Sequence, residues 1–128
     1  MAQQLLNIGI KSAVSAAGAF LGVEATKQAL KGAAECVKLM ADTKNKYEQK
    51  EHVKELLKHS EQLKDTCYSG SNLYDKALQK NREFNEDNDT SNKNADHVGV
   101  KELYELLEEV ASELNLVDVL EEVCPRAL

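Results

Sequence analysis

The chain has 128 residues, enough for one domain with its own hydrophobic core, and 42% of its residues are hydrophobic. Its net charge is −6, and the acidity is concentrated late in the chain. From Arg82 onward there are thirteen acidic and four basic side chains, a net of −9. Because phosphate binding needs a basic face, this balance argues against nucleic acid as the main partner.

The first predicted helix, residues 2–21, overlaps an almost uncharged segment from Leu5 to Val23, whose single charge is Lys11. Most of its surface is apolar, through Leu5, Leu6, Ile8, Ile10, Val14, Phe20 and Leu21. A narrow seam at steps of three and four carries Lys11, Ser15, Gly18 and Gly22. A helix that is apolar on nearly all sides belongs in the centre of a bundle or in a membrane. Gly18 and Gly22 suit close helix packing in either place.

The same segment has an alternative interpretation as a secretory signal peptide. Lys11 precedes an apolar run, and Val23-Glu24-Ala25 loosely resembles a cleavage box. Against this, ten residues precede the lysine, and the run is rich in Ala and Gly. We therefore treat the segment as part of the domain and keep the secreted form as an alternative.

Three further helices are predicted, over residues 24–41, 46–80 and 100–123, with Pro125 ending the last one. In the long third helix, residues 69–72 (SGSN) mark a weak point, but Leu73 and Tyr74 keep the helical register, which favours one continuous or kinked helix. Residues 82–98 are rich in Asn and Asp and predict a long flexible loop. The expected fold is all-α: one domain, residues 1–128, forming an antiparallel four-helix bundle around the apolar first helix.

The last predicted helix has a clean apolar stripe opposite a face rich in glutamate. The stripe includes Leu103, Leu107 and Val110. The acidic face consists of Glu102, Glu105, Glu108, Glu109 and Glu113. Such a face is suited to a basic partner protein.

No pattern in the chain indicates catalysis, a metal or a cofactor. His52 lies at helical spacing from glutamates, but on a lysine-rich face that predicts solvent exposure, and His59 lies two turns further along. The acidic residues 86–89 lack the glycine and terminal glutamate of a calcium loop. Cys36 and Cys67 fall on apolar stripes, which favours reduced core cysteines of an intracellular protein, while Cys124 is expected to be the most accessible. We predict that the protein is not an enzyme.

Three stretches together resemble a known group of domains. They are MAQQLLNIGIKSAVSAAGAFLGVEATKQAL, YEQKEHVKELLKHSEQLKDTCYSGSNLYDKAL and ELYELLEEVASELNLVDVLEE. This layout resembles the HeLo-type four-helix cell-death domains and the N-terminal coiled-coil domains of plant nucleotide-binding leucine-rich-repeat immune receptors, especially the powdery-mildew-resistance-like subclass. The likeness spans nearly the whole chain as a pattern.

The resemblance implies a plant-defence domain that is cytoplasmic at rest and oligomerises on activation, with possible contacts to other domains of a parent receptor. Residues 5–23 would then insert into the plasma membrane, permitting ion flux and a hypersensitive cell death. Nineteen helical residues span roughly 28 Å, close to the thickness of a hydrocarbon core. Lys11 within that span costs about 2.5–3.5 kcal/mol unless an oligomer turns its seam toward a wet lumen.

A second hypothesis belongs to a different class. The chain would be a soluble helical adaptor or effector, with the first helix in its core and the acidic face of the last helix binding a partner protein. A cleaved, secreted effector is a third hypothesis. The sequence leaves all three open.

Overall fold

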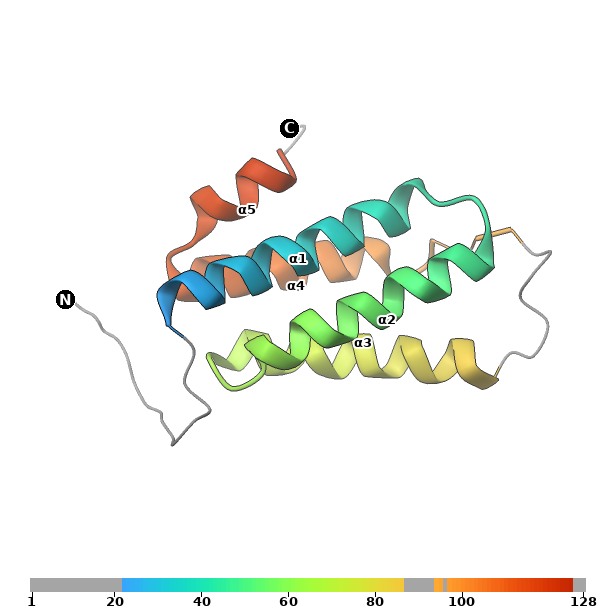
Figure 1. Cartoon of the computed structure of the whole chain (residues 1–128), viewed down its shortest axis with the longest axis horizontal. Helices are drawn as coiled ribbons and strands as arrows, with labels where there is room; N and C mark the ends of the chain where they lie inside the picture. The colour runs from blue at the N-terminus through green and yellow to red at the C-terminus, as the bar shows by residue number, and fades with distance from the viewer. Residues whose placement is uncertain (1–21, 87–93, 96, 126–128) are drawn as a thin grey trace.

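Five helices make up most of the residues that the computed structural model describes, which are residues 22–86, 94–95 and 97–125 (Figure 1). The helices are α1 (Val23–Asp42), α2 (Lys46–Leu63), α3 (Tyr68–Glu86), α4 (Val100–Leu114) and α5 (Val117–Val123). Extended pairing within the described ranges is confined to an isolated bridge between Asn45 and Asn94. The predicted all-helical class is therefore confirmed for this part of the chain.

Helices α1 to α4 form a ring in which each helix contacts two neighbours, because α1 also packs against α4. Consecutive helices run in opposite directions, and α5 folds back over α1 and α4 (Figure 1). Fully buried leucines from all four helices meet inside the ring, including Leu30, Leu56, Leu73 and Leu107. The ring thus buries the apolar stripes of its helices against one another.

The sequence predicts that the helix at the start of the chain forms the centre of the bundle. The predicted helix 2–21, with its apolar set Leu5 to Leu21 and the seam residues Lys11, Ser15 and Gly18, lies outside the described residues. Gly22 precedes α1, and its carbonyl accepts hydrogen bonds from the Thr26 N–H and hydroxyl, both at 2.9 Å. The four helices of the ring all come from residues 23–114. Across the described residues, no helix combines the length and apolarity needed to cross a membrane.

The α1 helix follows its sequence closely. Its buried positions include Leu30, Ala33, Val37 and Met40, which follow one another at helical steps of three and four, and its ends differ from the predicted 24–41 by one residue each. Asn45 then caps α2, with its side-chain oxygen accepting hydrogen bonds from two backbone N–H groups, at 2.8 and 3.2 Å. This satisfies two donors that a helix start leaves without partners.

The predicted continuous helix 46–80 was wrong, because residues 64–67 form a turn between α2 and α3. Thr66 closes the turn by donating from its N–H and its hydroxyl to the Leu63 carbonyl, at 3.1 and 2.7 Å. A Cβ on Gly70 would collide with that same carbonyl, so glycine allows the start of α3 to pack on the end of α2. The break therefore comes before the SGSN stretch, which itself is helical.

The predicted helix 100–123 was also wrong as a single element. Asn115 adopts a left-handed conformation (φ 59°, ψ 40°) at the end of α4, and the Leu116 N–H donates to the Ala111 carbonyl at 2.7 Å. This geometry reverses the chain. Asn115 can adopt it because asparagine tolerates left-handed backbone better than most residues do. The chain then forms α5.

The predicted loop 82–98 begins later than expected, because α3 continues to Glu86. Residues 87–93 and 96 lie outside the described part of the chain. The chain returns beside the α1–α2 turn, where the Ala95 N–H donates to the Lys44 carbonyl at 2.8 Å and His97 Nε2 lies 2.9 Å from the Thr43 carbonyl oxygen. Lys80 donates to the Val98 carbonyl at 2.8 Å, which ties α3 to the segment that leads into α4.

Candidate functional site: an acidic groove on α4

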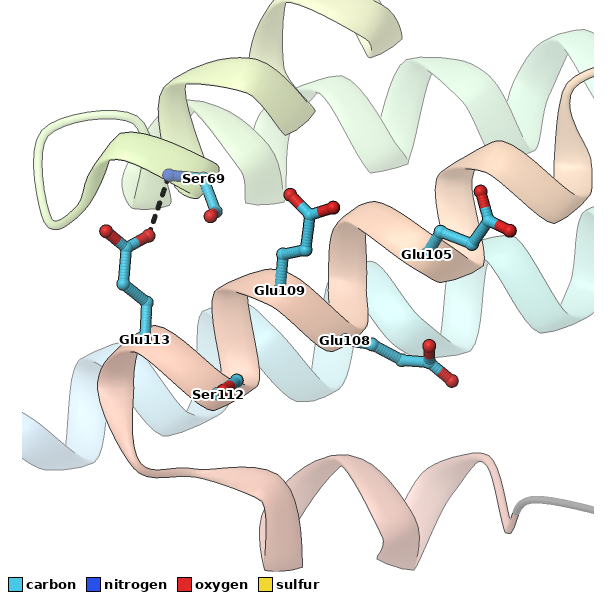
Figure 2. Close-up of a pocket in the computed structure, with 6 residues that line it drawn as sticks. All are labelled: Ser69, Glu105, Glu108, Glu109, Ser112 and Glu113. Carbon is cyan, nitrogen blue, oxygen red and sulfur yellow. Dashed lines mark hydrogen bonds between the residues drawn. The ribbon is translucent and has the colours of Figure 1, made fainter.

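A surface groove of about 530 Å³ runs along the solvent side of α4 to the start of α3. Its lining consists of Ser69, Glu105, Glu108, Glu109, Ser112 and Glu113 (Figure 2). Four of these six residues are glutamates of the predicted acidic face. The structure therefore brings most of that face together around one depression.

The helical repeat of α4 explains the arrangement. Leu103, Leu107 and Val110 face the core and are fully buried. Glu105, Glu109 and Glu113 follow at successive steps of four residues and lie toward solvent. The side chains of Glu109 and Glu113 point toward the start of α3, whereas that of Glu108 points away from it (Figure 2).

Glu113 has a structural task at one end of the groove. Its carboxylate accepts a hydrogen bond from the Ser69 N–H at 2.9 Å, across 44 residues of sequence. Burial by itself raises the pKa of this carboxyl, but the hydrogen bonds from Ser69, Cys67 and the Tyr68 backbone together outweigh burial, and the pKa is lowered. The next free donor of α3, the Gly70 N–H, bonds to the Cys67 sulfur at 3.2 Å. An ionised Glu113 and Cys67 thus cap α3 together.

Glu102 also has a partner inside the fold. Its carboxylate pairs with the Lys76 amine at 2.9 Å, which links α4 to α3. The structure places Glu102 outside the groove lining. The predicted acidic face is therefore not uniform, since two of its five members hold α3 and α4 together.

The middle of the face is different in this respect. Within the described residues, Glu105 and Glu109 have no hydrogen-bond or ion-pair partner, and both are exposed. Two carboxylates four residues apart repel each other and cost a helix about 0.2–0.5 kcal/mol. Glu108 adds a third negative charge within the same turns of α4. This part of the groove is a concentrated negative field with room for a cation.

The three cysteines are free and are not suited to nucleophilic chemistry at neutral pH. Burial, followed by the nearby Glu55 and Glu35 carboxylates, raises the pKa of Cys36 to about 11. Burial likewise raises the pKa of Cys67 and of Cys124. Because the thiolate is the reactive form, a raised pKa keeps these groups unreactive. Cys36 is buried as predicted, whereas Cys67 is half-buried.

The two helical histidines lie in α2, and neither is fully exposed, contrary to the prediction. A Cβ on Gly32 of α1 would come within 2.5 Å of the His59 ring, so this ring packs directly on the α1 backbone. Among the residues that the structure describes, no group of three or more His, Cys, Asp or Glu side chains is arranged to hold a metal ion.

Sequence reasoning missed the two serines of the groove. The sequence pattern marks Ser69 only as part of a weak point in a helix, although a serine near a helix start is a usual sign of a new N-terminus. Comparison with known proteins identifies no relative: no family model, curated protein or solved structure matches the chain.

Proposed function

We propose that this protein is an interaction module in which a four-helix bundle, α1 to α4, presents the α4 groove to a basic segment of a partner protein. The observation that carries the proposal is the unpaired state of Glu105 and Glu109, which lie one turn apart beside Glu108. This spacing costs α4 stability in the free protein. A lysine or arginine seated in the groove relieves the repulsion and gains a charge-assisted contact.

The geometry supports a protein segment as the occupant. The groove follows α4 for about two turns, from Glu105 to Glu113, which matches the length of a short helix or strand rather than a single ion. Its far end is closed by the Ser69 backbone and the Glu113 carboxylate. Charges on such an open rim contribute mainly to specificity and to the rate of association.

The test uses a fluorescein-labelled peptide with lysine at every third or fourth position, titrated with the full chain at about 0.15 M salt, where the Debye length is about 8 Å. The groove variant is Glu105→Gln with Glu108→Gln and Glu109→Gln. Its matched control is Glu51→Gln with Glu55→Gln and Glu61→Gln on α2, where all three side chains are exposed. Each rim contact contributes about 0.2–1 kcal/mol, so the groove variant is expected to bind about tenfold more weakly.

The control variant carries the same change in net charge and is expected to bind within about twofold of the unmodified chain, since long-range attraction is screened. Circular dichroism of both variants verifies that they fold. An equal loss of affinity in the two variants would contradict the proposal, because the groove would then be no better than any other acidic surface.

We propose, as a second function, that the protein is a membrane-targeting, oligomerising immune domain of the cell-death type. Val23, the last residue of the apolar segment 5–23, is 68% exposed at the start of α1. The apolar stripes of the ring helices are meanwhile buried against one another. Both observations favour a role for the segment outside this core. The chain would move from the cytoplasm to the plasma membrane on activation, and its oligomer would permit ion flux.

Dye leakage from vesicles of phosphatidylcholine and phosphatidylserine tests this second function. The variant is Leu6→Glu with Ile10→Glu and Phe20→Glu. The control places three glutamates at exposed apolar positions of the described helices, namely Leu39, Tyr47 and Tyr68. Leakage by the unmodified chain and the control, but not by the segment variant, is expected. Leakage that survives in a folded segment variant would contradict this function while leaving the peptide result untouched.

A further inference from the structure

The α5 helix is a small element that rests on two others. It packs on α1 and α4, and only Val119 and Leu120 among its seven residues are buried. Val123 is partly buried against the core, and two polar contacts also join α5 to α1: Lys31 pairs with Glu122 at 3.4 Å, and the Lys38 amine donates to the Val123 carbonyl at 3.3 Å. A helix of seven residues is not stable alone in water, so α5 exists because of this docking.

The connection between α4 and α5 is short and depends on one residue. Asn115 carries the one positive φ of a non-glycine residue in the described chain, and it alone separates the end of α4 from Leu116. In a right-handed conformation at Asn115, nothing in residues 112–121 would stop the helix, since this stretch contains no glycine or proline. The same sequence therefore has two ways to continue: the observed reversal and a straight extension.

The apolar pattern is compatible with the straight form. Val110, Leu114 and Val117 continue the α4 stripe at helical spacing, yet the reversal leaves Val117 43% exposed. A straight helix would place Val117 in line with the stripe, at the cost of removing Val119 and Leu120 from their site. That site, between α1 and α4, would then be empty. The segment that is known to fit this site is α5.

We propose that α5 of one copy docks on the α1–α4 site of a second copy, so that the chain forms a domain-swapped dimer with α4 and α5 as one continuous helix. The exchanged contacts are the ones observed within one chain, including Lys31 with Glu122 and the burial of Leu120. Because both copies donate and receive the same element, the assembly is closed by a two-fold axis. This dimer is independent of the proposed groove and of residues 5–23.

The test exploits the hinge. Asn115→Ala disfavours the left-handed conformation and favours the helix, whereas Asn115→Gly keeps the left-handed conformation accessible and weakens the helix. Light scattering after size exclusion measures the dimerisation constant of each full-length chain. Relative to the unmodified protein, Asn115→Ala is expected to dimerise about tenfold more tightly per hinge, and thus about a hundredfold per dimer. Asn115→Gly is expected to dimerise more weakly.

The Lys31–Glu122 ion pair reports which chain supplies α5. Equal amounts of ¹⁴N- and ¹⁵N-labelled unmodified chain are mixed in urea, refolded at high concentration and coupled with a carbodiimide, which joins an amine to a contacting carboxylate. Cross-links between differently labelled peptides in the dimer fraction are expected. Cross-links confined to one label, or a folded Asn115→Ala chain that stays monomeric at millimolar concentration, would overturn the proposal. The labelling result decides even if Asn115→Ala fails to fold.

Discussion

The contact between α1 and α2 and the contact between α3 and α4 differ in how they end at the surface. On the first side, Gly32 lets the His59 ring pack directly on the α1 backbone, which closes the seam. On the second side, Glu105 and Glu109 border an open groove. Both sides have fully buried leucines beneath them, Leu56 and Leu107. The apolar stripe decides which faces meet, and the residues flanking it decide whether the seam is closed or open to a ligand.

The largest expected effect is at the base of the two contacts. Leu56→Ala and Leu107→Ala each remove a fully buried side chain and should lower the free energy of unfolding by about 2–5 kcal/mol. Urea denaturation followed by circular dichroism measures both. Similar losses would show that the two contacts share one core. A loss below about 1 kcal/mol for Leu107→Ala would instead mean that the groove extends into a loosely packed interior.

The next largest effect is a loss of stability at alkaline pH, through Cys36 at the contact between α1 and α2. The pKa of Cys36 is raised to about 11 in the folded chain, above the ordinary value of 9.0 that the unfolded chain has. The folded state therefore holds this proton more tightly, and its stabilising effect is complete below pH 9 and is lost as the pH rises toward 11. The free energy of unfolding should fall by about 2 kcal/mol over that window from this group. Denaturation in buffered urea at each pH measures the decline.

Cys36→Ala provides the control for this pH dependence. The variant should start from a lower stability, because a buried thiol is lost, but show a shallower decline between pH 9 and 11. Some decline will persist, since burial raises the pKa of Tyr104 to about 12. An identical slope in the variant and the unmodified chain would contradict the role of Cys36.

Alanine substitutions at Gly70 and Gly32 should differ in their effect on stability, because Gly70 faces rigid backbone and Gly32 faces a side chain that can move. Gly70→Ala should cost about 1–3 kcal/mol, because its Cβ would meet the Leu63 backbone carbonyl. Gly32→Ala meets only the tip of the His59 side chain, which can turn outward, and alanine gains about 1 kcal/mol of helix propensity. Thermal unfolding should therefore show a clear loss for Gly70→Ala and a change within about 1 kcal/mol for Gly32→Ala. The opposite order would be incompatible with the packing at these two positions.

The smallest effects distinguish the acidic residues from one another. Glu113→Ala removes a cap of α3 and should cost about 1 kcal/mol. Glu105→Gln with Glu109→Gln removes only a repulsion and should stabilise the chain by about 0.2–0.5 kcal/mol. Chemical denaturation with both variants in parallel tests the difference in sign. A loss of stability in the double glutamine variant would mean that these carboxylates have structural partners.

The sequence predicted helices wherever the apolar repeat was local. The stripe containing Leu30, Val37 and Met40 predicts α1 almost to the residue. The apolar repeat did not predict the ends of helices where a group distant in the sequence determines them. The start of α3 depends on the Glu113 carboxylate, 44 residues away, and the helical register across residues 64–67 gave no sign of a turn. The reversal at Asn115 was missed because a lone asparagine is only a weak helix-end signal.

The candidate site could be predicted only in part, because local periodicity again shows one helix and not its partners in another. The glutamate face of α4 follows from periodicity alone, and Glu105, Glu108 and Glu109 do line one groove. Periodicity could not show that Glu102 pairs with Lys76 or that Glu113 caps α3, because both partners come from another helix. The packing of α3 against α4 was therefore needed to distinguish the structural carboxylates, Glu102 and Glu113, from the unpaired Glu105 and Glu109.

The order of neighbours around the ring also has a kinetic consequence. Three of its four contacts join helices that follow one another along the chain, and only the contact of α1 with α4 joins distant segments. Chains dominated by such local contacts fold quickly, because little loop entropy is lost before each contact forms. We therefore expect hairpins of neighbouring helices to assemble first and the meeting of α1 with α4 to come last. Weakening that last contact would speed unfolding and leave the folding rate nearly unchanged.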